Sequence, residues 1–252
     1  MAGTADNRIA PSRTGDPLIS TIIPCHNGER YLAEAIDSVL GQTYRAIEAI
    51  VIDDGSTDGS GEVAQSFHGA IRYRYQPHSG SAAARNLGVE LAQGAFFAFL
   101  DADDLWPEDK LRRQMAAFEA DSSLGIVAGH AEQFVSPELP DGIKARVRVD
   151  SRRMPAQLPG ALLVRRDEFQ RVGDYSRRFV TAGEIDWFMR ATELGVKTLM
   201  LPDIVLRRRI HDTNHGILRR DARQDYVRVL KAALDRRRSE SRGFKPDGVQ
   251  PN

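Results

Sequence analysis

Cysteine and long apolar runs are almost absent from this sequence of 252 residues. Cys25 is the only cysteine, so the chain cannot form an internal disulfide or a zinc site built from several thiolates. Cys25 ends an apolar run beside Pro24, which favours a packed thiol over a nucleophile. No stretch approaches the ~20 apolar residues of a membrane span, and the first sixteen residues have no apolar core typical of a signal peptide. We therefore expect a soluble, cytoplasmic protein.

Net charge is also absent, because 35 basic residues balance 35 acidic ones. This balance argues against nucleic acid as a partner of the whole molecule. The distribution is uneven: Leu206–Asn252 holds 13 Lys and Arg against 6 Asp and Glu, which leaves the first 205 residues with an equal acidic excess. Hydrophobic residues make up 41% of the chain, a globular composition that excludes a mostly disordered, collagenous or coiled-coil protein.

Strand and helix patterns alternate through the first half of the chain. The predicted strands are Leu18–Pro24, Ala46–Asp53, Ile71–Tyr75 and Phe96–Asp101, and the predicted helices are Leu32–Leu40, Glu62–Phe67, Ser81–Ala92 and Pro107–Ala120. Short connections between such elements indicate an α/β fold with helices on both faces of a sheet.

The second half is less regular. We expect strands at Gly125–Ala131, Val196–Leu201 and Ile204–Ile210, a short apolar segment at Gly160–Val164, helices at Glu184–Leu194 and around Tyr226–Leu234, and a long loop over Val135–Pro159. The helix around Tyr226–Leu234 is amphipathic and is followed by a tail rich in arginine.

Two acidic groups follow predicted strands: Asp53 with Asp54, and Asp101 with Asp103 and Asp104. Ligands of open α/β sheets bind outside the carboxyl ends of the strands, and a cation relieves the repulsion between clustered carboxylates. Carboxylate oxygens favour Mg²⁺ or Mn²⁺, which also bind phosphate oxygens, so a nucleotide diphosphate is a natural ligand. The alternative is turn chemistry alone, with Asp58 capping a helix.

Four segments resemble the family 2 glycosyltransferases of the GT-A fold in order and spacing: IIPCHN (Ile22–Asn27), VIDDGSTDGS (Val51–Ser60), GSAAARNLGVELAQG (Gly80–Gly94) and FLDADDLWPEDKL (Phe99–Leu111). Two later segments, Gly183–Gly195 and Arg207–His211, fit the family less closely. The resemblance implies a three-layer α/β/α fold with a mixed, mostly parallel central sheet. It also implies a flexible leader (1–16), a donor-binding half (17–112), an acceptor-side half (113–216) and a C-terminal helix with a basic tail (217–252).

The resemblance also implies roles for residues in the first half. The uridine pocket would involve Pro24, His26, Asn27, Asp53 and Asp54, with Asp54 bonded to the base. Arg85 would lie beside the donor, or else be a surface arginine paired with Asp54 or Glu90. Asp101 would lie near the ribose and Asp103 would hold the metal, while Asp104 would orient its neighbours or cap a helix at Trp106.

The motif that supplies the general base reads Glu-Asp-x-Asp in this family, and this sequence departs from it. Gly183 and Glu184 replace its Glu and its first Asp, and Asp186 keeps the second Asp. We expect Glu184 to be the base, with Asp186 as the second candidate. Alternatively, both carboxylates only begin a helix, whose dipole they suit.

Arg207, Arg208 and Arg209 should alternate between the faces of a strand. By resemblance, Arg209 would meet the diphosphate and His211 would contact the metal or a phosphate. A solvated basic edge that prevents strand pairing is the alternative.

The sequence as a whole predicts a metal-dependent glycosyltransferase. We expect it to use a nucleotide sugar, with a UDP-sugar as the first candidate, and to transfer the sugar with inversion. The acceptor is open: a saccharide, a lipid-linked sugar, a natural product or a peptide, with peripheral contact at the inner face of a membrane also open. The main alternative is a degenerate module that binds a nucleotide sugar without turnover. A phosphatase of the haloacid type would have its Asp-x-Asp motif after the first strand, followed by Thr or Val, whereas here the motif follows the fourth strand. For a nucleotidyltransferase or a dehydrogenase, the required glycine-rich motif is missing.

Overall fold

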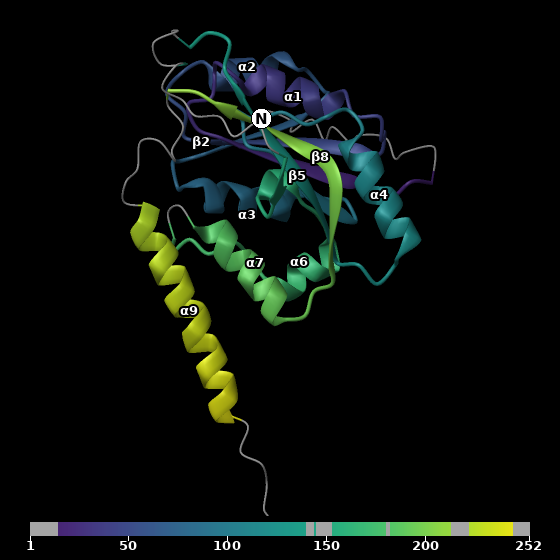
Figure 1. Cartoon of the computed structure of the whole chain (residues 1–252). Helices are drawn as coiled ribbons and strands as arrows, with labels where there is room; N and C mark the ends of the chain where they lie inside the picture. Colours follow the sequence, from purple (N-terminus) through teal and green to yellow (C-terminus); the bar gives the residue numbers. More distant parts are fainter. Residues whose placement is uncertain (1–14, 140–143, 145–152, 180–181, 213–221, 244–252) are drawn as a thin grey trace, which may run out of the picture.

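The computed structural model describes residues 15–139, 144, 153–179, 182–212 and 222–243 (Figure 1). The predicted leader, residues 1–16, therefore lies almost wholly outside the described residues, as do residues 140–143 and 145–152 of the long loop predicted over Val135–Pro159.

An eight-stranded mixed sheet forms the centre of the molecule. Its strands are β1 (Ile19–Cys25), β2 (Ile47–Asp54), β3 (Arg72–Gln76), β4 (Phe96–Phe99), β5 (Ile126–Val135), β6 (Met154–Ala156), β7 (Leu163–Arg165) and β8 (Thr198–Ile210). The order is β3-β2-β1-β4-β7-β5-β6, and β8 also pairs with β5. The first four strands run parallel, as do β5 and β8, whereas β7 and β6 pair antiparallel to their neighbours.

Helices cover both faces of this sheet. They are α1 (Leu32–Leu40), α2 (Ser60–Ser66), α3 (Ser81–Leu91), α4 (Lys110–Ala120), α6 (Arg166–Val172), α7 (Gly183–Glu193) and α9 (Ala222–Gly243), with a short 3₁₀ turn η1 at Pro159–Ala161. In Figure 1, α1 and α2 lie above the sheet and α3, α6 and α7 below it, while α9 lies outside the body beside α7. The predicted three-layer α/β/α architecture is confirmed.

Strand alternation divides the buried side chains into two cores. Ile19 and Ile23 of β1 face the core shared with α1 and α4, while Ile22 faces the core shared with α3, α6 and α7. Gly88 lets α3 lie very close to β1, because a Cβ at position 88 would lie only 2.3 Å from Cγ2 of Ile22. Burial on both faces explains why these strands read as continuous apolar runs in the sequence.

The structure corrects two predictions about element boundaries. The helix expected from Pro107 begins at Lys110, because Pro107–Asp109 form a turn in which the Pro107 carbonyl accepts from the Lys110 amide at 3.1 Å. Asp104 consequently caps no helix at Trp106. The two strands expected at Val196–Leu201 and Ile204–Ile210 are one strand, β8, which tolerates Pro202 because its register against β5 shifts between Met200 and Ile204.

Two elements were not predicted. Helix α6 follows β7 directly, and its seven residues are too few to show a helical period; its only sequence signals are the acidic first turn and Gly173, which ends it with φ +82°. Strand β6 and the extension of β5 to Val135 occupy part of the segment expected to be a loop.

Candidate active site

The two acidic groups lie at the same edge of the sheet. β1 pairs with β2 on one side and with β4 on the other, all parallel, so Asp53 and Asp54 end one strand and Asp101 follows the other at the same end. The sequence prediction that these carboxylates gather at one edge is confirmed by this topology.

Asp53 and Asp54 hold the loops of this edge together. Asp53 accepts from the Ser56 amide at 2.8 Å and from the Tyr73 hydroxyl at 2.7 Å. Asp54 accepts from the amides of Ser79 and Gly80, each at 2.8 Å. Both side chains are almost fully buried, so in this structure their carboxylates shape the loop before α3.

Two histidines stack above this pair of carboxylates. The rings of His26 and His78 lie 4.1 Å apart, and Nδ1 of His26 is 2.8 Å from the Asp54 carbonyl oxygen. His78 also lies 2.9 Å from the Asp54 carboxylate. Gly55 makes this close packing of His78 possible, because its φ is +73° and a Cβ at position 55 would lie 2.6 Å from the backbone nitrogen of His78. Sequence reasoning missed His78, whose only signal is its position just before α3.

Asn27 and Pro24 complete this side of the site. Asn27 is exposed, adopts φ +52° and joins the loop after β1 to the loop after β2. Its backbone amide donates to the Ser56 hydroxyl at 2.9 Å, and its side-chain oxygen accepts from the Thr57 backbone amide at 2.8 Å. Pro24 is buried in β1 one residue before Cys25, whose pKa burial raises to about 11. The Cys25 thiol is therefore packed and protonated.

Arg85 links the two halves of the chain. It is only 4% exposed and donates one guanidinium nitrogen to Asp101 and another to Glu184 of α7. Burial opposes its charge, but the Asp101 and Glu184 carboxylates raise the pKa of Arg85 above its ordinary value. The surface arginine paired with Asp54 or Glu90, the alternative to a donor-side role, is excluded by this geometry.

The ring of Tyr175 packs against the guanidinium of Arg85. Its ring centre lies 5.9 Å from the Arg85 guanidinium, and its backbone is fixed by two hydrogen bonds with the Asn86 side chain, at 2.9 and 3.0 Å. Asn86, directly after Arg85 on α3, thus anchors the loop that leads to α7. No sequence pattern predicts this role for Tyr175, which lies 90 residues from Arg85.

β8 brings its basic end beneath the second acidic group. Leu105 and Arg207 form an antiparallel bridge, which places Arg209 and His211 beside Asp103 and Asp104. Nε2 of His211 lies 2.9 Å from Oδ2 of Asp103, and the Asp104 carboxylate accepts from the Arg209 amide at 2.8 Å. Burial, and then the neighbouring Asp103 and Asp101, raise the pKa of Asp104 well above its ordinary value. Asp104 thus orients its neighbours, one of the two roles predicted for it.

Arg209 is buried under these carboxylates. It is 2% exposed, and its guanidinium donates to the Asp103 carbonyl at 3.0 Å and to Glu34 at 2.8 Å. Arg207 and Arg209 both lie against the Phe134 ring, at 5.1 and 4.8 Å, as expected for alternate residues of one strand.

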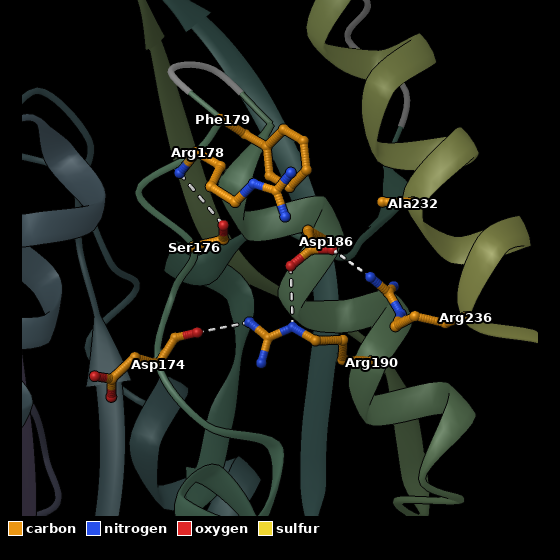
Figure 2. A pocket seen from close by; sticks show the side chains of 8 residues that line it. All are labelled: Asp174, Ser176, Arg178, Phe179, Asp186, Arg190, Ala232 and Arg236. Atoms are coloured by element: carbon orange, nitrogen blue, oxygen red, sulfur yellow. Dashed lines mark hydrogen bonds and ion pairs between the residues drawn. The ribbon is translucent and has the colours of Figure 1, made fainter. Parts of the chain in front are cut away.

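Asp186 belongs to a different surface. Residues two apart on a helix do not share a face, so Glu184 and Asp186 diverge on α7. Asp186 accepts from Arg190 and from Arg236 of α9, each at 3.0 Å, in a pocket of about 250 Å³ between α7, α9 and the segment 174–179 (Figure 2). The two arginines that bind Asp186 come from α7 itself and from α9, whereas Glu184 is bound by Arg85 of α3.

Asp103 and His211 are the residues best placed to hold a divalent cation. The Asp103 carboxylate is 34% exposed and Nε2 of His211 lies 2.9 Å from it, so an oxygen and a nitrogen that can bind a metal lie next to each other. No group of three or more His, Cys, Asp or Glu side chains arranged for a metal occurs in the part of the chain that the structure describes. Two protein ligands fit a cation completed by water and phosphate oxygens.

Comparison with solved structures shows the same fold at low sequence identity. S. aureus TarS 1–349 in complex with UDP-GlcNAc superposes with a TM-score of 0.70 and 19% identity, over 86% of this chain and 65% of that one. The mannosyltransferase PcManGT from Pyrobaculum calidifontis, in complex with GDP-Man and Mn²⁺, gives a TM-score of 0.67 and 22% identity, over 96% of this chain and 68% of that one. The fold is therefore of the GT-A type.

Curated relatives match a shorter stretch more closely. An uncharacterized glycosyltransferase of Haemophilus influenzae is 47% identical over 103 residues, which are 39% of this chain and 41% of that protein. The glycosyltransferase GlyG of Streptococcus pneumoniae is 38% identical over 115 residues, 43% of this chain and 38% of GlyG. The matched region thus spans about two fifths of the length of these relatives.

The model of the family described as "Glycosyl transferase family 2" matches residues 20–170, more than half of the chain. This stretch contains β1 to β7 and both acidic groups of the site. The chain therefore belongs to glycosyl transferase family 2.

Proposed function

We propose that this protein transfers a sugar from a nucleotide-diphosphate donor, a UDP-sugar first, to an acceptor hydroxyl, with inversion and with help from a divalent cation. The observation that carries the proposal is the contact of Arg85 with both Asp101 and Glu184, since it joins a carboxylate of the first half to one on α7. Family membership and the nucleotide sugars bound by TarS and PcManGT support the donor class.

The donor would bind at the edge formed by β1, β2 and β4. The stacked imidazoles of His26 and His78 offer a flat face for a nucleobase, and Asn27 and the Asp53–Asp54 pair fix the loops around it. Asp54 would bond the base only by exchanging one of its loop contacts. Asp101 lies on the opposite side, where a ribose or sugar hydroxyl would meet it.

Asp103 and His211 would hold Mg²⁺ or Mn²⁺, which would neutralise the charge that develops on the departing diphosphate. Arg209 is placed to support these residues rather than to touch the donor, because its guanidinium is buried against Glu34 and the Asp103 carbonyl. Arg209 would thus act on the donor through Asp103.

Glu184 would act as the general base. Its carboxylate is 22% exposed and is oriented by Arg85, so an acceptor hydroxyl can reach it and transfer its proton to the free oxygen. The acceptor oxygen then attacks the anomeric carbon while the bond to the diphosphate oxygen breaks on the opposite face, which inverts the configuration. Asp186 is the weaker candidate, because both of its oxygens are bound by arginines.

The alternative function is nucleotide-sugar binding without turnover, motivated by Gly183 and Glu184 at motif positions where the family resemblance expects Glu and Asp. The acceptor, whether saccharide, lipid-linked, natural product or peptide, and a cytoplasmic location remain predictions. No described helix is long and apolar enough to cross a membrane.

The decisive experiment combines UDP calorimetry with slow UDP release from UDP-sugars. We expect Mn²⁺ to tighten UDP binding at least tenfold in the native protein and to have little effect in Asp103→Asn, which should also lose UDP release. Asp109→Asn is the matched control, because Asp109 pairs with exposed Arg113, outside the site. Binding indifferent to Mn²⁺ and to Asp103→Asn would remove the metal assignment, and metal-dependent binding without hydrolysis or transfer would favour the binding module.

A further inference from the structure

Helix α9 carries an apolar stripe that no described part of the chain covers. Val227, Leu230 and Leu234 expose 66%, 55% and 53% of their surface. Their spacings of three and four residues place them along one side of the helix. Large aliphatic side chains are seldom this exposed in a row on a helix that also packs against the body of a protein.

The opposite side of α9 fixes the helix to the body. Val229 and Ala233 are buried, and Val229 clusters with Phe179 and Ala182 at the start of α7. Arg236 adds ion pairs to Asp186 and Glu193 of α7, at 3.0 and 2.8 Å. Figure 1 shows α9 beside α7, with its C-terminal half extending past the rest of the molecule. The exposed stripe therefore belongs to a docked helix and faces outward.

Basic residues accompany the stripe. Arg228 and Lys231 are exposed, and Arg223 and Arg238 stand four positions from Val227 and Leu234 in the sequence. The helix as a whole carries seven Arg and Lys against three Asp and Glu. An aliphatic stripe flanked by Lys and Arg is the pattern of a helix that lies in the interface of an anionic membrane.

We propose that α9 is a membrane-surface helix, which inserts Val227, Leu230 and Leu234 among the acyl chains of an anionic bilayer while its basic residues meet the headgroups. A second copy of the chain fits this surface less well. Three side chains offer far less apolar area than the roughly 1,200 Å² that a stable interface buries, and like charges would face each other. The proposal does not depend on turnover, but it extends the proposed function: because α9 docks at the start of α7, it would hold Glu184 near a lipid surface.

Vesicle sedimentation of the full chain tests the proposal. We expect binding to vesicles of phosphatidylcholine with phosphatidylglycerol, little binding to phosphatidylcholine alone, and weaker binding as salt is raised. Leu230→Gln with Leu234→Gln should lower the partition coefficient at least tenfold, and glutamine preserves helix propensity. Leu158→Gln with Leu199→Gln is the matched control, because these leucines are 38% and 39% exposed but lie outside α9.

Every outcome of this experiment is informative. Absence of binding to anionic vesicles, or equal binding by the α9 variant and the control, would overturn the proposal. A dimer detected by light scattering and lost in the α9 variant would assign the stripe to a second copy instead. Calorimetry with UDP and Mn²⁺ on both variants separates this proposal from the donor site, since we expect neither variant to change UDP affinity.

Discussion

Glu184 and Asp186 show how two carboxylates only two residues apart acquire different roles. Glu184 points to Arg85 and keeps one oxygen partly accessible, whereas Asp186 is 3% exposed and bound by two arginines. A base must be reachable by the acceptor and able to take its proton, and of these two carboxylates Glu184 fits both conditions better, which is why we propose it as the base.

Glu184→Gln should therefore lower kcat by about 10²-fold or more, because the amide cannot accept the acceptor proton, and should leave UDP affinity within about threefold. Single-turnover transfer or UDP release from the donor measures the first quantity and calorimetry the second. Glu168→Gln is the control, because Glu168 is a half-buried carboxylate of α6 that also pairs with an arginine, Arg171. Turnover that survives Glu184→Gln would move the base to Asp186 or to another group.

Arg85 adds a positioning role at the same scale. Its planar fork contacts Asp101 and Glu184 with separate nitrogens, a geometry that the single ammonium of lysine cannot reproduce. The sequence marked Arg85 as a donor-side candidate by resemblance, but its link to Glu184 joins residues 99 positions apart and was visible only in the structure.

At the scale of elements, the contact between α3 and β1 sets the position of Arg85. α3 lies against β1 and β2, and Gly88 sits directly over Ile22, one turn after Arg85. A larger residue at position 88 would push α3 away from the sheet and move Arg85 with it.

Gly88→Ala should destabilise the fold by about 1–3 kcal/mol, although alanine favours a helix more than glycine does, because the new Cβ would overlap Ile22. Urea denaturation measures the change. In an Ile22→Ala background, where that contact is removed, the same substitution should cost much less or become stabilising. Equal costs in the two backgrounds would show that the contact does not limit the packing of α3.

On the scale of the whole molecule, α9 depends on a few contacts with α7. Its buried side chains are Val229, Ala233 and Asp225, and Arg236 joins it to Asp186 and Glu193. Both of these carboxylates are largely buried, so removal of Arg236 would leave two acidic groups without this cation.

Arg236→Met should release α9 from the body at a cost of about 1–3 kcal/mol, since the ion pairs are only partly screened by solvent. Chymotryptic cleavage within α9, and faster amide exchange in that helix, would report the release while the central sheet stays protected. Arg228→Met is the control, because Arg228 is 66% exposed and pairs with Asp225 of the same helix. The same protection of α9 in both variants would contradict a holding role for Arg236.

The sequence by itself determined the α/β pattern of the first half, the place of both acidic groups at strand ends and the membership in a family of glycosyltransferases. Apolar runs, turn residues and short connections are local features, and they fix β1 to β4 and α1 to α3 within a few residues. The elements of the second half were harder to predict. Helix α6 is too short to show a helical period in the sequence, and Pro202 lies within β8, where the register against β5 shifts.

Only the tertiary structure decided which residues meet. The bridge between Leu105 and Arg207 brings His211 to Asp103, the docking of α7 brings Glu184 to Arg85, and the docking of α9 brings Arg236 to Asp186. These contacts join residues roughly 50 to 110 positions apart and depend on how the helices pack on the sheet. A sequence pattern carries the chemistry of each residue, but packing sets the distances on which catalysis depends.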